Sequence, residues 1–131
     1  MISEKINSII DKYYSAINLV KENISCYCVD PASDFTRSRK ITPDILIDYL
    51  VQLQSKFCRS EIADYFVHYD DIPSDSALCQ QRAKLLPSAL KRVFQLFNSS
   101  YAPSKTWQGF YILAFDGSDI NIPRDLDDEE T

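Results

Sequence analysis

The chain has 131 residues, a net charge of −5, two glycines and four cysteines. Its length suits one modest domain with a core, and so few glycines argue against an all-β fold rich in tight turns. The charge is uneven, because residues 77–105 contain Lys and Arg but no acid, whereas residues 61–75 contain acids but no Lys or Arg. Local basic blocks therefore say more about partners than the net charge does.

The cysteine spacing and the hydropathy exclude several classes of protein. There is no Cys-x-x-Cys pair and only one His, so a structural zinc site is not indicated. No apolar run approaches the roughly 20 residues that a membrane helix needs. Charged residues interrupt the N-terminal segment in which a secretory signal would lie. We therefore expect reduced cysteines and a cytoplasmic location.

The first predicted helix covers about residues 3–21. Its apolar residues recur at alternating spacings of four and three, at Ile6, Ile10, Tyr13, Ile17, Val20 and Ile24. Such a stripe either packs on its own domain or forms a dimerising coiled coil. The flanking positions lack a consistent charge code, which favours packing within the domain.

A second helix is predicted to begin at Pro43, with Thr42 as its N-cap, and to extend its apolar face as far as Phe57. Three cations, Arg37, Arg39 and Lys40, come just before this start. Cations gain nothing from the positive end of a helix dipole. They form either a solvated surface cluster or a site that holds DNA phosphates together with the free N–H groups of the helix.

Three further helices follow, beginning near Ser60, at Ser74 or Asp75, and at Pro87. The third and fourth flank a turn with proline, which predicts a helix-turn-helix-like element. In its second helix Gln81 and Arg82 are side-chain types that read base edges, and Lys84 suits phosphates. On the fifth helix, which should end near Asn98, two cations are expected to face outward: Lys91 and Arg92.

A short apolar run, residues 111–115, leads directly into Asp116 and Gly117. Its length and its bounding turn residues predict a buried strand. The Asp-Gly pair is either a hairpin turn or the end of a strand at which a metal, a charge or hydrogen bonds stabilise the carboxylate. Asp116 is thus the first candidate for chemistry.

Three segments of the chain resemble, in the right order, the bacterial insertion-sequence DDE transposases. The segment 113–123 resembles the first catalytic-aspartate motif of that family, and the segments 35–42 and 76–85 resemble parts of its N-terminal region. The resemblance implies a helical DNA-binding domain over residues 1–105. It also implies that residues 106–131 are the first β-strands of a truncated RNase-H-like α/β domain. By the same resemblance, Asp116 is a catalytic residue and a ligand of Mg²⁺, which would act as a pair of ions held by three carboxylates.

The second Asp and the Glu of the family site have no counterpart, so the chain as given is expected to be catalytically incomplete. The expected function is binding of transposon-end double-stranded DNA during DNA transposition, through eight side chains: Arg37, Arg39, Lys40, Gln81, Arg82, Lys84, Lys91 and Arg92. The unpaired strand edge at residues 111–115 also invites self-association. The alternative is a small helical regulatory or protein-interaction module that does not touch DNA, which would suit the negative net charge.

Overall fold

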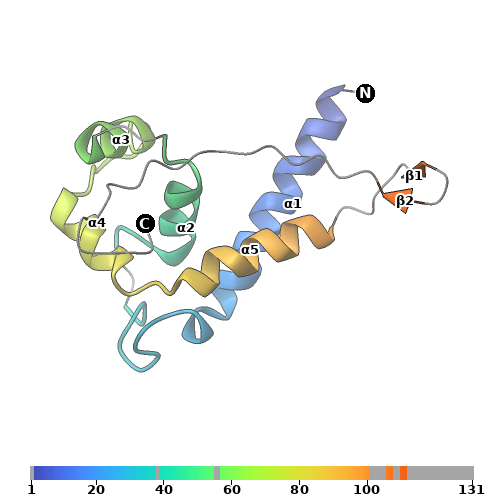
Figure 1. The fold of residues 1–131 in the computed structure, drawn as a ribbon. Helices are drawn as coiled ribbons and strands as arrows, with labels where there is room; N and C mark the ends of the chain where they lie inside the picture. The colour runs from blue at the N-terminus through green and yellow to red at the C-terminus, as the bar shows by residue number, and fades with distance from the viewer. Residues whose placement is uncertain (1, 38, 55–56, 101–105, 108–109, 112–131) are drawn as a thin grey trace, which may run out of the picture.

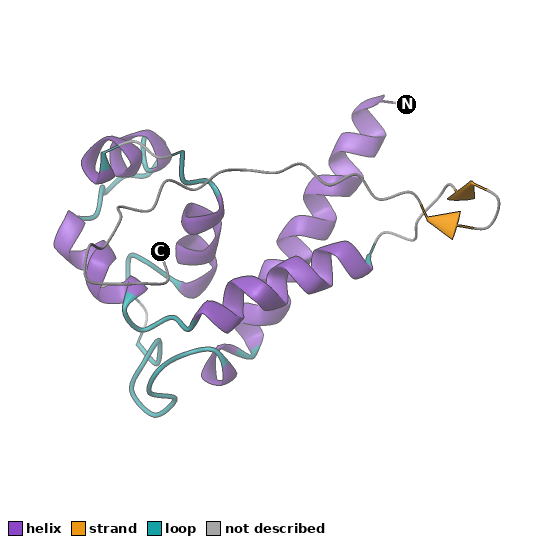
Figure 2. Ribbon diagram, in the orientation of Figure 1, coloured by secondary structure: helices purple, strands orange, loops and turns teal. Residues whose placement is uncertain are grey.

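The computed structural model describes residues 2–37, 39–54, 57–100, 106–107 and 110–111, and this part is mainly helical, as predicted (Figures 1 and 2). Its elements are α1 (Ile2–Glu22), the 3₁₀ turn η1 (Ile24–Cys26), α2 (Pro43–Val51), α3 (Cys58–Tyr65), α4 (Asp75–Arg82), α5 (Pro87–Ser99), β1 (Thr106–Trp107) and β2 (Phe110–Tyr111). In Figure 1 the long helices α1 and α5 pack across one another, and α2, α3 and α4 gather at one end of α5.

The two short strands form one antiparallel pair, with Thr106 opposite Tyr111 and Trp107 opposite Phe110. The predicted strand meets β2 only at Tyr111. Its remaining residues and Asp116 lie outside the described residues. Beyond this strand pair, the predicted RNase-H-like part of the fold lies outside the described residues.

Most helix starts follow the local chemistry of the sequence. Pro43 occupies the first turn of α2, where its missing N–H costs nothing. Ser74 caps α4, since its hydroxyl oxygen accepts a hydrogen bond of 3.2 Å from the Ala77 backbone N–H. The second helix is shorter than predicted: it ends at Val51, and Phe57 lies at the N-cap of α3 with 88% of its surface exposed.

A first hydrophobic cluster is formed where α1, α2 and α5 meet. Its buried members are Ala16, Ile17, Val20, Ile47, Ala89 and Val93. The predicted apolar stripe of the first helix therefore divides in two. Its second half, including Ile17 and Val20, packs inside the domain, whereas Ile6 and Ile10 in its first half remain 50% and 45% exposed.

A second hydrophobic cluster lies between α2, α3, α4 and Ile41, which stands two residues before α2. Its buried members are Ile41, Leu46, Tyr49, Ile62, Phe66 and Leu78. The helix α2 contributes to both clusters, because Ile47 belongs to the first and its neighbour Leu46 to the second. Leu85, between α4 and α5, also packs against both.

A buried carboxylate joins the helices that make these clusters. Asp48 of α2, 8% exposed, accepts hydrogen bonds from the hydroxyls of Tyr13 on α1 (2.7 Å) and Tyr65 on α3 (2.5 Å). The side-chain amide of Gln52 donates a third, at 2.9 Å. Burial and the nearby carboxylate raise the pKa of both tyrosines, so the hydroxyls stay protonated as donors.

The connection between α3 and α4 differs from the expected helix-turn-helix. Residues 66–74 join the two helices, a longer link than the roughly three- or four-residue turn of that motif. Much of this segment is exposed, but Phe66 and Pro73 are buried and anchor it to the body. No helix within the described ranges is long and apolar enough to cross a membrane.

Candidate nucleic-acid interface

The loop that leads into α2 is held against the turn between α4 and α5. The Val29 backbone N–H donates to the Lys84 carbonyl at 2.9 Å, and the Leu86 N–H donates to the Tyr27 carbonyl at 2.9 Å. These two bonds flank a single antiparallel bridge between Cys28 and Leu85. Residues distant in sequence are thereby placed side by side.

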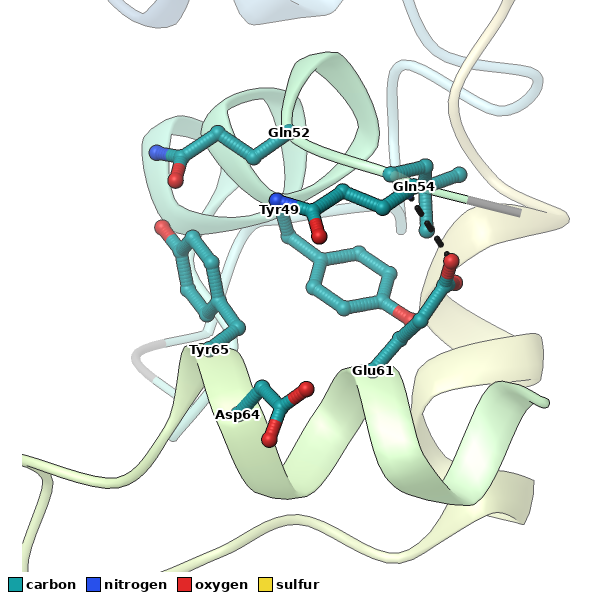
Figure 3. A pocket seen from close by; sticks show the side chains of 7 residues that line it. Tyr49, Gln52, Gln54, Glu61, Asp64 and Tyr65 are labelled. Atoms are coloured by element: carbon teal, nitrogen blue, oxygen red, sulfur yellow. Dashed lines mark hydrogen bonds between the residues drawn. The ribbon is translucent and has the colours of Figure 1, made fainter. Parts of the chain in front are cut away.

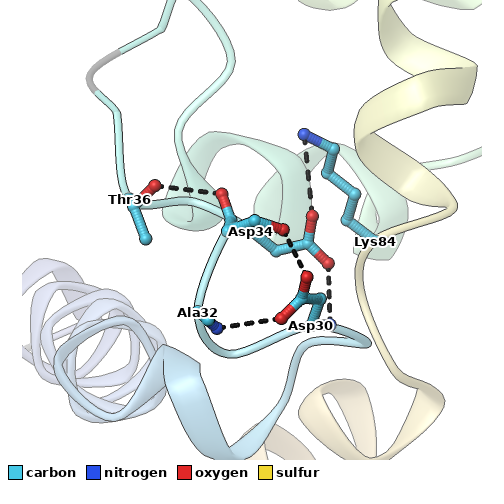
Figure 4. A network of polar contacts seen from close by, with 6 residues as sticks. Asp30, Ala32, Asp34, Thr36 and Lys84 are labelled. Carbon is cyan, nitrogen blue, oxygen red and sulfur yellow. Dashed lines mark hydrogen bonds and ion pairs between the residues drawn. The ribbon is translucent and has the colours of Figure 1, made fainter.

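Two carboxylates shape this loop internally (Figure 4). Asp30 accepts hydrogen bonds from the Ala32 backbone N–H (3.0 Å) and the Ser33 hydroxyl (2.7 Å). The Ser33 hydroxyl, with smaller help from the backbone, lowers the pKa of Asp30. Asp34 accepts from the Asp30 N–H at 2.9 Å, and its other oxygen lies 3.7 Å from the Lys84 ammonium. The loop is therefore fixed both by its own turns and by an ion pair to the α4–α5 turn.

Phe35 follows this network in an unusual backbone conformation. Its φ is 57°, in the left-handed region that disfavours residues with a side chain. Holding a non-glycine residue there costs about 1–3 kcal/mol. The ring is partly buried against the second hydrophobic cluster, which offsets that cost. The turn at Phe35 directs the chain into the segment that holds Arg37, Arg39 and Lys40.

Two cavities, of about 510 and 550 Å³, share Arg39, Ile41 and Gln81 in their walls, and together we call them the basic groove. Its charged and amide-bearing walls come from α1, the loop and α4 with its C-terminal turn: Lys21, Arg37, Arg39, Lys40, Gln80, Gln81 and Lys84. Five of the eight predicted DNA-binding residues thus line one groove: Arg37, Arg39, Lys40, Gln81 and Lys84. Sequence reasoning missed Lys21, which carries no signal beyond its place in the last turn of a helix.

The cations of the basic groove differ in their partners. Lys21 pairs with Asp44 at 3.0 Å, Lys84 with Asp34, and Lys40 with Asp71. Arg37 and Arg39 are exposed, and neither forms an ion pair with another residue that the structure describes. These two guanidinium groups are therefore the cations most available to an incoming anion, and their planar forks match a phosphate.

Three predicted DNA-binding residues do not line the basic groove. Arg82 is exposed near Tyr49, on another side of α4 from Gln81. Lys91 and Arg92 are exposed on α5, as predicted, but neither lines a cavity of the basic groove. The two side chains predicted to read bases together, Gln81 and Arg82, therefore face different surroundings.

A separate small cavity, about 140 Å³, opens between α2 and α3 (Figure 3). Its walls carry Glu61 and Asp64 beside the tyrosines Tyr49 and Tyr65. The Glu61 carboxylate accepts a 3.0 Å hydrogen bond from the Gln54 backbone N–H. Burial raises the pKa of Tyr49 to about 12. This acidic site would repel phosphate, so it is not the nucleic-acid interface.

The described residues do not meet the requirements of a metal site. Among the described residues no group of three or more His, Cys, Asp or Glu side chains could hold a metal ion. The predicted ligand Asp116 lies outside them. No known protein family, curated protein or solved structure matches the chain. The resemblance to DDE transposases therefore remains a prediction from the sequence.

Proposed function

We propose that the helical body, residues 1–105, is the DNA-binding unit of a DDE-transposase-type protein and binds double-stranded DNA at transposon ends. One observation carries the proposal: cations from three separate parts of the chain line a single groove. A solvated surface cluster would need no such convergence. The basic groove shares no wall residue with the acidic cavity lined by Glu61 and Asp64.

The chemistry of the basic groove supports contacts with the DNA backbone. Arg37 and Arg39 follow a loop that the Asp34–Lys84 pair anchors, and both residues line the same cavity. Guanidinium groups bind phosphates through two parallel hydrogen bonds. Phosphate contacts give affinity and orientation without sequence information, which must come from other side chains. In this proposal Arg37 and Arg39 are the principal backbone contacts.

The catalytic part of the proposal rests on the sequence alone. Asp116 would bind Mg²⁺ together with carboxylates that the chain as given does not supply, and the reaction would be phosphodiester hydrolysis and strand transfer. The residues of the basic groove have no part in that chemistry. Their role is to hold the DNA, which can be tested separately.

The test compares two double substitutions that remove the same charge. Arg37→Ala/Arg39→Ala takes two cations from the basic groove, and Lys91→Ala/Arg92→Ala takes two from the exposed face of α5. Binding to a labelled mixed-sequence duplex is measured by fluorescence anisotropy at several salt concentrations. Losing two phosphate contacts should reduce the slope of log K against log salt by about 1.8, at roughly 0.9 per contact.

We expect that reduction in the groove variant and a much smaller one in the α5 variant. Equal effects of the two variants would show that only the overall charge matters and would refute the proposed interface. The alternative of a regulatory module that does not touch DNA predicts that the unaltered protein binds no duplex at any salt concentration.

A further inference from the structure

The side chain at the floor of the basic groove has no role in the structure described so far. Gln81 is 6% exposed, and it lies in the wall shared by both cavities. Its carboxamide forms no hydrogen bond with another residue in the described ranges. The Gln81 amide atoms are not among the polar atoms fully shielded from solvent, so water in the cavities can satisfy them, and a ligand that enters can replace that water.

An intact duplex cannot form hydrogen bonds with the Gln81 carboxamide. Base edges lie at the floor of a major groove about 8.5 Å deep, so the side chains that read them protrude from a protein surface. Gln81 is buried instead, whereas Arg37 and Arg39, which line the same cavity, are exposed. We call Arg37 and Arg39 the rim of the groove. A duplex that lies on the rim would contact these cations and leave the carboxamide without a hydrogen-bond partner. The group that reaches Gln81 must enter the cavity.

One of the two cavities lined by Gln81 also presents side chains of the types that bind nucleotides. Phe35 presents an aromatic ring, and Arg37 and Lys84 present cations, all in the walls of the same space of about 510 Å³. That volume lies in the usual range of small-ligand sites, about 300–1,000 Å³. Aromatic rings stack on bases, and cations bind phosphates. The ring of Phe35 is held there despite its positive φ, and strain of this kind concentrates at ligand sites.

We propose that the floor of the basic groove is a site for one unpaired nucleotide of a DNA strand whose paired part lies on the rim. Phe35 stacks on the base, the Gln81 carboxamide donates to and accepts from its edge, and Arg37 and Lys84 bind its phosphate. A glutamine matches adenine best, because adenine presents a donor and an acceptor side by side. The site deepens the proposed function and rests on it, since the rim must hold duplex DNA.

The experiment uses the full chain and three labelled duplexes of one sequence. The first is fully paired, the second carries a single unpaired adenosine, and the third carries an abasic spacer at the same place. We expect the unpaired adenosine to tighten binding at least about fivefold over the other two, the lower end of the contribution of one stacked base. Competition with free dAMP separates a strand-borne nucleotide from a free one, and dAMP should displace the second duplex no better than inorganic phosphate does.

Three variants show which side chains produce the preference for the unpaired adenosine. Gln81→Met keeps the length and burial of the side chain and removes its polar atoms, and Phe35→Leu keeps apolar packing and removes the ring. Gln95→Met makes the first change at an exposed position of α5. The first two should abolish the preference for the unpaired adenosine over the paired duplex, and the third should leave that preference unchanged.

The outcomes separate the two proposals. Equal affinity for the three duplexes, or a preference that survives Gln81→Met, would overturn the nucleotide site and leave DNA binding by the rim intact. Displacement by micromolar dAMP would assign the site to a free nucleotide and overturn the strand-borne one. Failure to bind any of the duplexes would instead refute the proposed function.

Discussion

Removing one hydroxyl from the Asp48 network should destabilise the whole helical body. Tyr65→Phe deletes the 2.5 Å hydrogen bond to Asp48 but keeps the ring and its edge contacts with Tyr49 and Phe66. A hydrogen bond to a charged group contributes about 1.5–3 kcal/mol. Because the carboxylate is buried and the bond short, we expect a loss of about 2–3 kcal/mol.

The same reasoning ranks the other changes in this network. Tyr13→Phe deletes the longer, 2.7 Å bond from a ring that is half-buried like that of Tyr65, so about 1–2 kcal/mol is expected. Asp48→Leu leaves both tyrosine hydroxyls and the Gln52 amide without their acceptor and should cost about 3–5 kcal/mol. Native stability is roughly 5–15 kcal/mol, so this variant should be close to unfolding at room temperature.

Urea denaturation followed by circular dichroism measures these differences. With an m-value of about 1.5 kcal/mol per molar urea, a loss of 2 kcal/mol lowers the midpoint by roughly 1.3 M. Tyr14→Phe is the matched control, because Tyr14 adjoins Tyr13 on α1 but is 47% exposed, and its change should be within about 0.5 kcal/mol. If Tyr13→Phe and Tyr65→Phe were as mild as this control, the network would not hold the helices together.

Three further predictions follow from the same structure. Burial raises the pKa values of Tyr13, Tyr65 and Tyr49 above the ordinary value of 10, so their hydroxyls lose protons more easily in the unfolded chain than in the folded one. The contribution of these tyrosines to the free energy of unfolding should therefore be fully present below pH 10 and decrease as the pH rises above it. Absorbance at 295 nm should show these tyrosines ionising only as the helical signal disappears, and ionisation within a folded protein would contradict the assignment. Ser74→Ala removes the cap of α4 and should cost about 1 kcal/mol in urea denaturation, whereas an unchanged midpoint would show that the cap is dispensable. Ile47→Ala empties a fully buried position of α2 and should cost about 2–5 kcal/mol by the same measurement; a cost below about 1 kcal/mol would mean that the first cluster is loosely packed.

The sequence predicted the elements where local chemistry decides the conformation. The Pro43 start and the Ser74 cap were found because proline and a hydroxyl act on their own backbone, whereas Thr42 stands at the N-cap of α2 without a capping hydrogen bond from its side chain. Phe57 was misassigned to the second helix, because its spacing continues an apolar stripe and the break after Val51 carries no glycine or proline. Asp48 could not be singled out, since nothing nearby in the sequence shows that two distant tyrosines reach it.

The sequence identified most of the cations of the candidate site but not how they are arranged in space. The block before α2 was identified, but that it shares a groove with Lys21 and Lys84 depends on tertiary packing. Gln81 and Arg82 were expected to act together, although consecutive helical residues point about 100° apart and do not face each other. That spacing rule was the available signal that only one of them could face the basic groove.

The division of the core into two clusters also determines what a ligand in the basic groove would do. Lys21 lies at the end of α1, a helix of the first cluster, and Ile24 begins the turn η1 that follows it. Ile41 and Gln81 belong to the loop and the helix α4 that contribute to the second cluster. A ligand that spans the basic groove therefore contacts residues beside both hydrophobic clusters, which α2 connects. Such a ligand would couple their opening, because it binds only when both clusters are closed. Ligand binding would therefore stabilise both clusters at once. Amide hydrogen exchange in α3 and α4 would slow together with exchange in α1 and α5.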